Sequence, residues 1–317
     1  MNLRQLEYFV RVAELGSFSK AAVVLDVAQP ALSRHVRALE TDLRATLLQR
    51  TGRGVTLTDA GRRLFEHGVG ILQLVARATE ELEGARGVPA GRIAVGLPPS
   101  IGRQLTLPLV EAFKQRYPKA RLAIVEGFSA HIGEWIASGR VDLGLMYNPE
   151  VQPALEIVPV LDDVLCLVQR RAAARRAEPA RKAARTPAGP LPLRDLPSYP
   201  LIMPERTHAL RKLLQTQAAL NGLTLNFAWE VASIPSIIDL VCAGYGNAVL
   251  TASAVGASTR ARELVVRPLV DPSVTSVLCL VQSAHRQATP LVREVAKLLT
   301  ALVAGLPRAP TAAGKPR

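Results

Sequence analysis

Apolar positions at helical spacing in the first forty-three residues predict three short helices. The first spans residues 3–15 and ends at Gly16, because glycine tolerates the left-handed conformation at a helix C-terminus. Ser17 and Ser19 offer hydroxyl caps for a second helix at 20–25. Pro30 opens a third helix that extends to about Leu43, since its missing N–H costs nothing in a first helical turn. The pattern predicts a helix-turn-helix.

The third predicted helix has two contrasting faces. Its apolar stripe consists of Leu32, Val36, Leu39 and Leu43. A different face carries polar side chains at i, i+4 and i+8, namely Gln29, Ser33 and Arg37, with Arg34 beside them. A helix that packs on one side and presents long hydrogen-bond donors on the other is typical of a recognition helix.

Residues 47–58 follow as two β-prone runs around a basic, glycine-bearing tip, and predict a wing. Thr58 and Asp59 then cap a long helix that reaches Gly84. Its apolar positions have the spacing of a coiled-coil seam: Leu64, Ile71, Val75, Ala78 and Leu82. We therefore expect this linker helix to dimerise and to hold the winged domain away from the rest of the chain.

From residue 92 onward, strand-like and helix-like segments alternate. Strands are expected at 92–97, 120–127, 141–147, near 201, up to 227, at 248–250 and at 277–281. Helices are expected at 100–117, 129–138, 207–220, 235–243 and 289–302. This alternation implies a parallel sheet covered by helices, arranged as two α/β lobes.

The formal net charge of +13 does not by itself identify a nucleic-acid partner, because most of it lies in two segments. Residues 170–193 are rich in Ala, Arg and Pro, and we interpret them as an exposed basic insertion that the sheet does not use. Residues 307–317 form a basic tail that we expect to be disordered. Support for DNA binding must therefore come from the pattern of the N-terminal domain.

Several other classes of protein are disfavoured. No 18-residue uncharged apolar run is present and the N-terminus lacks the features of a signal peptide, so we expect a cytoplasmic protein with no membrane partner. Cys166, Cys242 and Cys279 lie far apart in apolar contexts and are interpreted as reduced core residues. His131 and Glu134 are one helical turn apart but have no further ligand at metal-binding spacing, so we expect neither a metal nor a cofactor.

The N-terminal motifs closely resemble those of the LysR-type transcriptional regulators over about sixty residues. They are found in Ser17–Ala22, Ala28–Arg34, Leu48–Arg50 and Val55–Gly61. The resemblance implies a winged helix-turn-helix domain (1–58), a dimerising linker helix and hinge (59–91), and a two-lobed effector domain similar to periplasmic binding proteins (92–306). Within the family, the chain resembles the group that controls nitrogen assimilation or the catabolism of small acids.

The family resemblance also implies partners and contacts. The expected partners are a double-stranded DNA operator, RNA polymerase, a second copy of the chain in a homodimer or homotetramer, and a small-molecule effector. DNA contacts are expected from the third helix and the wing, at Gln29, Pro30, Ala31, Ser33, Arg34, Arg37, Arg50, Thr51, Arg53 and Gly54. Gln and Arg suit base edges in the major groove, Ala31 suits a thymine methyl, and Ser33, Arg50 and Thr51 suit phosphates.

The effector is expected between the lobes, beyond the carboxyl ends of the strands. Four hydroxyl residues fall at predicted helix starts there: Ser100, Ser129, Thr207 and Ser233. Together they favour a small organic anion, although each hydroxyl alone is equally explained as a helix cap. Apolar walls are expected from Pro99, Ile101, Phe128, Tyr147, Ile234 and Ile237, and further polar contacts from Asn148, His208 and Asn247.

Three other functions compete with regulation by an effector. A pure solute-binding protein is favoured by the C-terminal half alone, but the missing signal-peptide features and the predicted winged helix oppose it. An α/β enzyme is disfavoured because no nucleophile elbow, metal cluster or phosphate loop is present. A DNA-binding protein indifferent to sequence is suggested by the net charge, but most of that charge lies outside the predicted reading helix.

Overall fold

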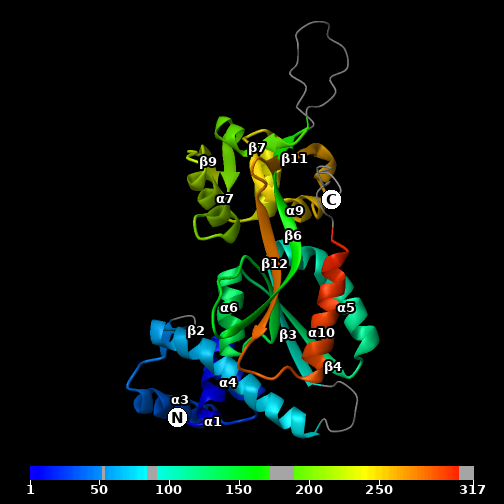
Figure 1. Cartoon of the computed structure of the whole chain (residues 1–317). Helices are drawn as coiled ribbons and strands as arrows, with labels where there is room; N and C mark the ends of the chain where they lie inside the picture. The colour runs from blue at the N-terminus through cyan, green and yellow to red at the C-terminus, as the bar shows by residue number, and fades with distance from the viewer. Residues whose placement is uncertain (52–53, 84–90, 172–188, 307–317) are drawn as a thin grey trace, which may run out of the picture.

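The computed structural model describes residues 1–51, 54–83, 91–171 and 189–306 (Figure 1). The N-terminal domain consists of α1 (Leu3–Leu15), α2 (Phe18–Val24), α3 (Gln29–Leu43) and a hairpin of β1 (Leu48–Thr51) with β2 (Gly54–Leu57). The predicted winged helix-turn-helix is therefore confirmed, and each predicted helix agrees with the structure to within two residues at either end.

Local chemistry sets the boundaries of these helices. Asn2 and Gln5 form a reciprocal capping box at the start of α1, and Gly16 ends the helix at φ 59°. The Ser17 hydroxyl accepts from Lys20 N and caps α2. The three helices then bury one shared core, which includes Leu6, Phe9, Ala21, Leu32, Val36 and Leu39.

The linker helix α4 (Asp59–Glu83) starts at Thr58, whose hydroxyl accepts from Gly61 N at 3.0 Å. The predicted seam is partly wrong, because Leu64 and Ile71 pack against the winged domain of their own chain. Val75 is 41% exposed, Ala78 is also exposed, and the side chain of Leu82 lies outside the described residues. A seam facing a partner is thus limited to the C-terminal part of the helix.

The first lobe has three layers. Its central strands are β3 (Gly91–Leu97), β4 (Ala120–Glu126) and β5 (Leu143–Tyr147), which pair in parallel. α5 (Pro99–Arg116) and α10 (Pro290–Ala304) cover one face, and α6 (Ser129–Ser138) covers the other (Figure 1). Most residues of β3 and β5 are buried on both faces, as a sheet between helices requires, whereas those of the edge strand β4 are half-buried or exposed.

Two long strands join the lobes, and the sequence pattern revealed only part of one of them. β6 (Leu155–Arg170) and β12 (Thr275–Ser283) pair antiparallel, and β12 is also antiparallel to β5, so the expected all-parallel sheet is wrong. Pro159 and the two aspartates at 162–163 interrupt the apolar run of β6. Pro159 is accommodated beside a register shift in the ladder, where a missing N–H is tolerated.

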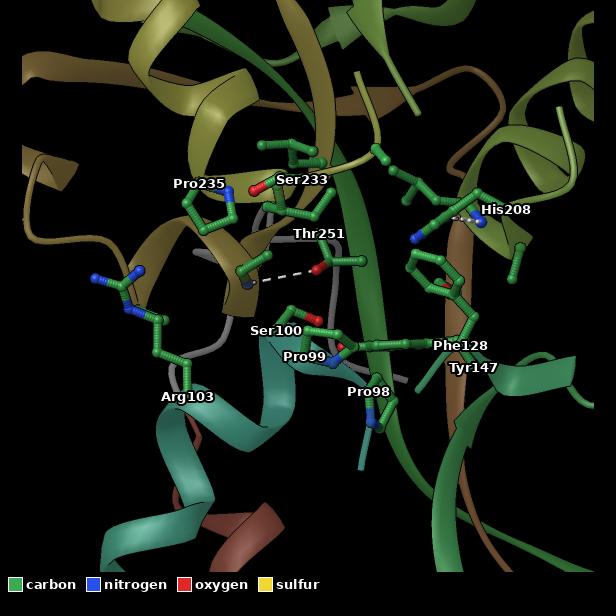
Figure 2. A pocket seen from close by; sticks show the side chains of 18 of the residues that line it. Pro98, Pro99, Ser100, Arg103, Phe128, Tyr147, His208, Ser233, Pro235 and Thr251 are labelled. Atoms are coloured by element: carbon green, nitrogen blue, oxygen red, sulfur yellow. Dashed lines mark hydrogen bonds between the residues drawn. The ribbon is translucent and has the colours of Figure 1, made fainter. Parts of the chain in front are cut away.

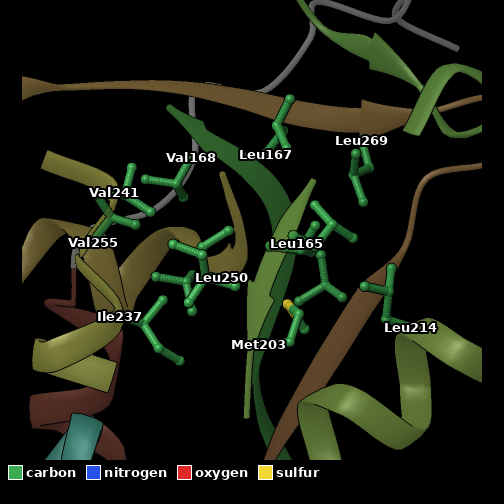
Figure 3. Packing of buried hydrophobic residues seen from close by; sticks show 14 of the residues in the cluster. Leu165, Leu167, Val168, Met203, Leu214, Ile237, Val241, Leu250, Val255 and Leu269 are labelled. Carbon is green, nitrogen blue, oxygen red and sulfur yellow. The ribbon is translucent and has the colours of Figure 1, made fainter. Parts of the chain in front are cut away.

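The second lobe forms around the far half of β6 (Figure 3). β10 (Ala248–Thr251) and β11 (Leu264–Val270) pair with β6, while β8 (Leu201–Met203) and β9 (Phe227–Glu230) form a small parallel sheet. The helices of this lobe are α7 (Ala209–Leu220), α8 (Ile234–Ala243) and the short α9 (Ala252–Gly256). The expected two-lobed α/β architecture is confirmed.

The limits of the predicted insertion at 170–193 are wrong at both ends. Arg170 is the last residue of β6, and β7 (Leu191–Pro192) pairs with β11 and leads into a short 3-10 helix at Leu193–Ser198. Leu191 and Leu193 are buried, so the sheet does use this part of the chain. Residues 172–188 and the predicted tail at 307–317 lie outside the described residues. No helix among the described residues is long and apolar enough to span a membrane.

Candidate functional site

The reading face of α3 is separated cleanly from its packing face. Gln29, Pro30, Arg34 and Arg37 are exposed, Ala31 and Ser33 are half-buried, and the apolar residues Leu32, Val36 and Leu39 are buried. Thr51 is exposed and its hydroxyl donates to Gly54 O at 3.3 Å, which closes the wing. Arg53 and the side chain of Arg50 lie outside the described residues.

Contacts behind this face fix the orientation of α3. His35 packs edge-on against Tyr8 of α1, with ring centroids 5.2 Å apart. The Glu40 carboxylate accepts from Leu47 N at 2.8 Å and from Leu48 N at 3.1 Å. Because these two bonds tie the end of α3 to the first strand of the wing, helix and wing are held as one unit.

A cavity of about 670 Å³ lies between the two lobes (Figure 2). This volume falls within the range of sites that bind small organic molecules. Residues from both lobes line it, among them eight predicted for the effector: Pro99, Ser100, Phe128, Ser129, Tyr147, His208, Ser233 and Ile234. The expected location between the lobes thus coincides with a real cavity.

Other predicted effector residues do not line this cavity. Ile101 and Ile237 are fully buried in the cores of their lobes, because helical geometry turns each of them inward. Asn148 has φ 45° and bonds to Ser276 Oγ and Val277 N, so it fixes a turn. Asn247 bonds to Gln169 and to Pro200 O, and Thr207 lies outside the lining as well.

The alternative interpretation, that each of the four hydroxyls only caps its helix, applies to one of them. Only Ser233 is an N-cap, accepting from Ser236 N at 3.5 Å. Ser100 and Ser129 lie inside the first turns of their helices, and His208 rather than Thr207 caps α7. The Ser129 hydroxyl instead accepts from Tyr147 N at 3.0 Å.

Four serine hydroxyls in the cavity lining share one hydrogen-bonding state. Ser129, Ser233, Ser258 and Ser276 each accept an N–H from the protein, at 2.9–3.5 Å. A hydroxyl that already accepts still has its own O–H to donate. These side chains therefore present donors to whatever fills the cavity, and a carboxylate is a group that only accepts.

Charges near the cavity are few. Within its described lining, Arg103 is the one basic residue apart from His208, and Glu126 is the one acid; both are exposed. Burial lowers the pKa of His208, which opposes protonation. Since its Nδ1 accepts from Leu210 N at 3.2 Å, the neutral ring carries its proton on Nε2.

Asp163, on β6, lies behind the cavity wall where the lobes meet. Its carboxylate accepts from Tyr147 Oη of the first lobe at 3.0 Å, and from the hydroxyl and N–H of Ser253 in the second. Burial and this neighbouring carboxylate raise the pKa of Tyr147, so the phenol remains a donor. The network joins the two lobes through the middle of the crossing strand.

Family models match both halves of the chain. Residues 3–62 match the bacterial regulatory helix-turn-helix protein of the lysR family, and residues 86–304 match the LysR substrate binding domain. The chain belongs to the LysR family. Members of this family are DNA-binding transcription regulators, and the identification therefore favours regulation over the competing enzyme hypothesis.

Full-length relatives of the LysR chain are similar along almost all of it. It is 28% identical over 304 residues to the nitrogen assimilation regulatory protein nac of Klebsiella aerogenes, covering 96% of this chain and 95% of the relative. It is 30% identical to the transcriptional regulator BbuR of Bordetella bronchiseptica, and the similarity covers 96% of this chain and 89% of BbuR. The fold resembles that of full-length CbnR complexed with its target DNA, with a TM-score of 0.67 and 24% sequence identity. The similarity covers 96% of this chain and 100% of the CbnR chain.

Several residues that line the cavity of this LysR protein were not predicted from the sequence. Thr251 ends β10 and caps α9, so it repeats the pattern of a strand, a hydroxyl and a helix that identified Ser233. Arg103 lies three residues after Ser100 on the same helix and was within reach of the same argument. Ser276 and Ser258 had no such signal, because a crossing strand and a loop bring them to the cavity.

Proposed function

We propose that this chain binds a specific double-stranded operator through α3 and the wing. The observation that carries the proposal is the exposure of Gln29, Arg34 and Arg37 opposite the buried stripe of α3. Gln and Arg make bidentate contacts to adenine and guanine in the major groove. Ala31 then meets a thymine methyl, Ser33, Arg50 and Thr51 hold phosphates, and Pro30, Arg53 and Gly54 complete the contact surface.

Mapping the genomic fragments that the full chain retains tests this proposal. Operator recognition predicts a short recurrent sequence with two related half-sites, because a dimeric helix-turn-helix protein reads both. Retention of all fragments alike, at one salt concentration, would instead support the alternative of a DNA-binding protein indifferent to sequence.

We propose further that the cavity binds a small organic anion with a largely apolar body. Serine O–H groups left free to donate support an acceptor such as a carboxylate, and Arg103 at the rim adds a positive charge. Pro98, Pro99, Phe128, Ile234 and Leu250 supply apolar surface for the remainder of the ligand. This pairing of few polar groups with apolar walls is usual for small-molecule sites.

A panel of small carboxylates, each paired with its neutral primary amide, tests the ligand class by calorimetry. The proposal predicts that at least one acid binds and that its amide binds more weakly. The reason is that the neutral amide replaces a charged carboxylate, which only accepts hydrogen bonds. Equal affinity of acid and amide would exclude an anion site.

The chain is also proposed to act as a homodimer or homotetramer. Leu74, Val75 and Ala78 of α4 are exposed and continue the apolar pattern beyond the part that packs on the chain's own winged domain. Light scattering at micromolar concentration tests this, and a monomer would contradict it.

The remaining expectations follow from regulation of transcription. Control of genes implies a location with the bacterial chromosome in the cytoplasm and contact with RNA polymerase. We also propose the functional division into a winged domain (1–58), a linker (59–91) and an effector domain (92–306). Because the chain is similar to a regulator of nitrogen assimilation, the first effectors to examine are small nitrogen compounds and small acids. The first regulated genes to examine are the neighbouring genes that act on such compounds.

A further inference from the structure

Helix α6 extends from the effector cavity to the linker helix. Phe128 caps its N-terminus and Ser129 is its first residue, and both line the cavity. Its other end, at Ser138–Arg140, lies against α4 (Figure 1). Ile132 and Ile136 are fully buried against the sheet and hold the axis of the helix between these two ends.

The contact between α4 and α6 is close and specific. At Gly70 of α4, an added Cβ would collide with the backbone oxygen of Ser138, so only glycine fits. With its amide oriented to match its neighbours, Gln73 donates to Gly139 O at 2.7 Å and to Arg140 O at 2.9 Å. α4 therefore binds the carbonyl groups of the two residues that directly follow α6.

Arg286 anchors the same end of α6 from the other side. Its Nη2 donates to Ile136 O and Ala137 O, each at 2.8 Å. The last turn of α6 is thus bonded to the loop that follows β12, and the two residues after it are bonded to the linker helix.

A row of aromatic contacts follows α6 from the second lobe toward α4. His208 of the second lobe meets Phe128 edge-on across the cavity, with centroids 5.3 Å apart (Figure 2). The ring centroids of Phe128 and His131 are 6.0 Å apart, and the His131 ring stacks on that of Trp135 with centroids 6.0 Å apart. The Arg140 guanidinium lies 4.7 Å from the centre of the Trp135 ring. This row of contacts joins the second lobe to the residue whose carbonyl Gln73 binds.

The opposite face of α4 contacts the DNA-reading domain. Gly68 lies against Leu6 and Val10 of α1, where an added Cβ would be 3.0 and 3.1 Å from their side chains. α1 in turn packs on α3 in the buried core of the winged domain. Densely packed contacts of this kind transmit displacement, because they have little room to deform.

We propose that α6 couples closure of the effector cavity to the orientation of the reading helix, through its contact with α4 at Gly70 and Gln73. This inference rests on the proposed function of the cavity and concerns how that site is regulated. A ligand that draws the lobes together changes the His208–Phe128 contact, and α6 passes the change to the linker. Gln73 is a positioning residue that touches neither ligand nor DNA.

Chemical closure of the cavity tests the coupling without an identified ligand. In full-length protein carrying Phe128→Cys and His208→Cys, a short bismaleimide would join the lobes. The three native thiols are buried, and burial raises the pKa of each, so they react poorly. Affinity for a selected operator duplex is measured before and after cross-linking. We expect a change of about fivefold or more, the lower end of allosteric coupling.

The same cross-link is then compared in three backgrounds. Gln73→Ala, and independently Gly70→Ala, should reduce the response to less than about twofold. Glu66→Ala, at an exposed position of α4, is the matched control and should keep the full response. A full response in Gln73→Ala and Gly70→Ala, or no response in any background, would overturn the coupling. Failure to bind any duplex specifically would instead overturn the proposed operator function, so the two failures are distinguishable.

Discussion

At the scale of residues, the proposed reading face of α3 combines long side chains that can donate hydrogen bonds, and it carries only a small part of the net charge. Gln29 and Arg34 are exposed on the first turns of α3, where a recognition helix meets base edges. Much of the net charge of the chain lies elsewhere. Sequence specificity and general affinity for DNA are therefore expected to depend on different residues.

Gln29→Ala and Arg34→Ala should each weaken operator binding by about 1–3 kcal/mol, because each would remove one of the proposed bidentate contacts to a base. Binding to a random duplex should change little. The measurement is the ratio of the two dissociation constants at one salt concentration. Arg11→Ala is the control, since it removes an exposed arginine on α1. Equal losses on both duplexes would contradict direct reading of bases.

In the cavity, Ser100 offers the clearest test of a hydroxyl contact. No hydrogen bond involves its Oγ among the described residues, so Ser100→Ala leaves no partner inside the protein unsatisfied. We expect a loss of about 1.5–3 kcal/mol in affinity for the anion, as for a hydrogen bond to a charged group. Calorimetry measures this loss, with exposed Ser198→Ala as the control. Unchanged affinity would remove Ser100 from the site.

At the scale of elements, α7 depends on an unusual cap. His208 Nδ1 accepts from Leu210 N, whereas the sequence left the neighbouring Thr207 open as the cap. Only a neutral imidazole has an acceptor nitrogen, so protonation removes the cap. Burial lowers the pKa of His208 below its ordinary value of 6.5 in the folded state.

This lowered pKa predicts the sign of a pH effect on stability. The contribution of His208 is fully present above pH 6.5, where the unfolded state is also neutral, and is lost as the pH falls through the lower folded-state pKa. His208→Gln should therefore flatten the fall in the free energy of unfolding on acidification, by about 1 kcal/mol, the usual value of a cap. Urea titrations from pH 7.5 to 5 measure it. The exposed His285→Gln should leave the slope unchanged.

At the scale of the whole molecule, two crossing strands and one network hold the lobes around the cavity. β6 and β12 pass between the lobes, and Asp163 bonds to Tyr147 on one side and Ser253 on the other. The basic segment 172–188 follows Arg171 in the sequence. It holds five basic residues and one acid, a net charge of +4.

Replacing those five basic residues, Arg175, Arg176, Arg181, Lys182 and Arg185, by Gln should leave thermal unfolding unchanged. It should lower affinity for random duplex and flatten its salt dependence, by about 0.9 in slope for each phosphate that is no longer neutralised. Deletion of 170–193 should differ sharply, because it also removes β7 and the buried Leu191 and Leu193. Removal of each buried leucine costs about 2–5 kcal/mol. An unchanged salt slope in the Gln variant would contradict a role for this charge.

The amino-acid sequence by itself determined the local elements of this protein. Helical spacing, Gly16, Pro30 and the serine caps specify the winged domain, because capping and packing of short helices depend on neighbouring residues. The alternation of strand-like and helix-like patterns after residue 91 likewise predicted two α/β lobes. The helix starts near Ser129 and Ser233 also indicated where the cavity would lie.

The tertiary structure decided what depends on distant segments. β6 was missed because Pro159 and Asp163 break its apolar pattern, and only pairing with β12 makes these residues acceptable. Ile101 and Asn148 were assigned to the cavity, yet helix rotation and a turn direct them elsewhere. The contact of α6 with α4 has no sequence signal, since Gly70 and Ser138 meet only after both domains have folded. Packing across long separations in sequence therefore determined the cavity lining and its connection to the reading helix.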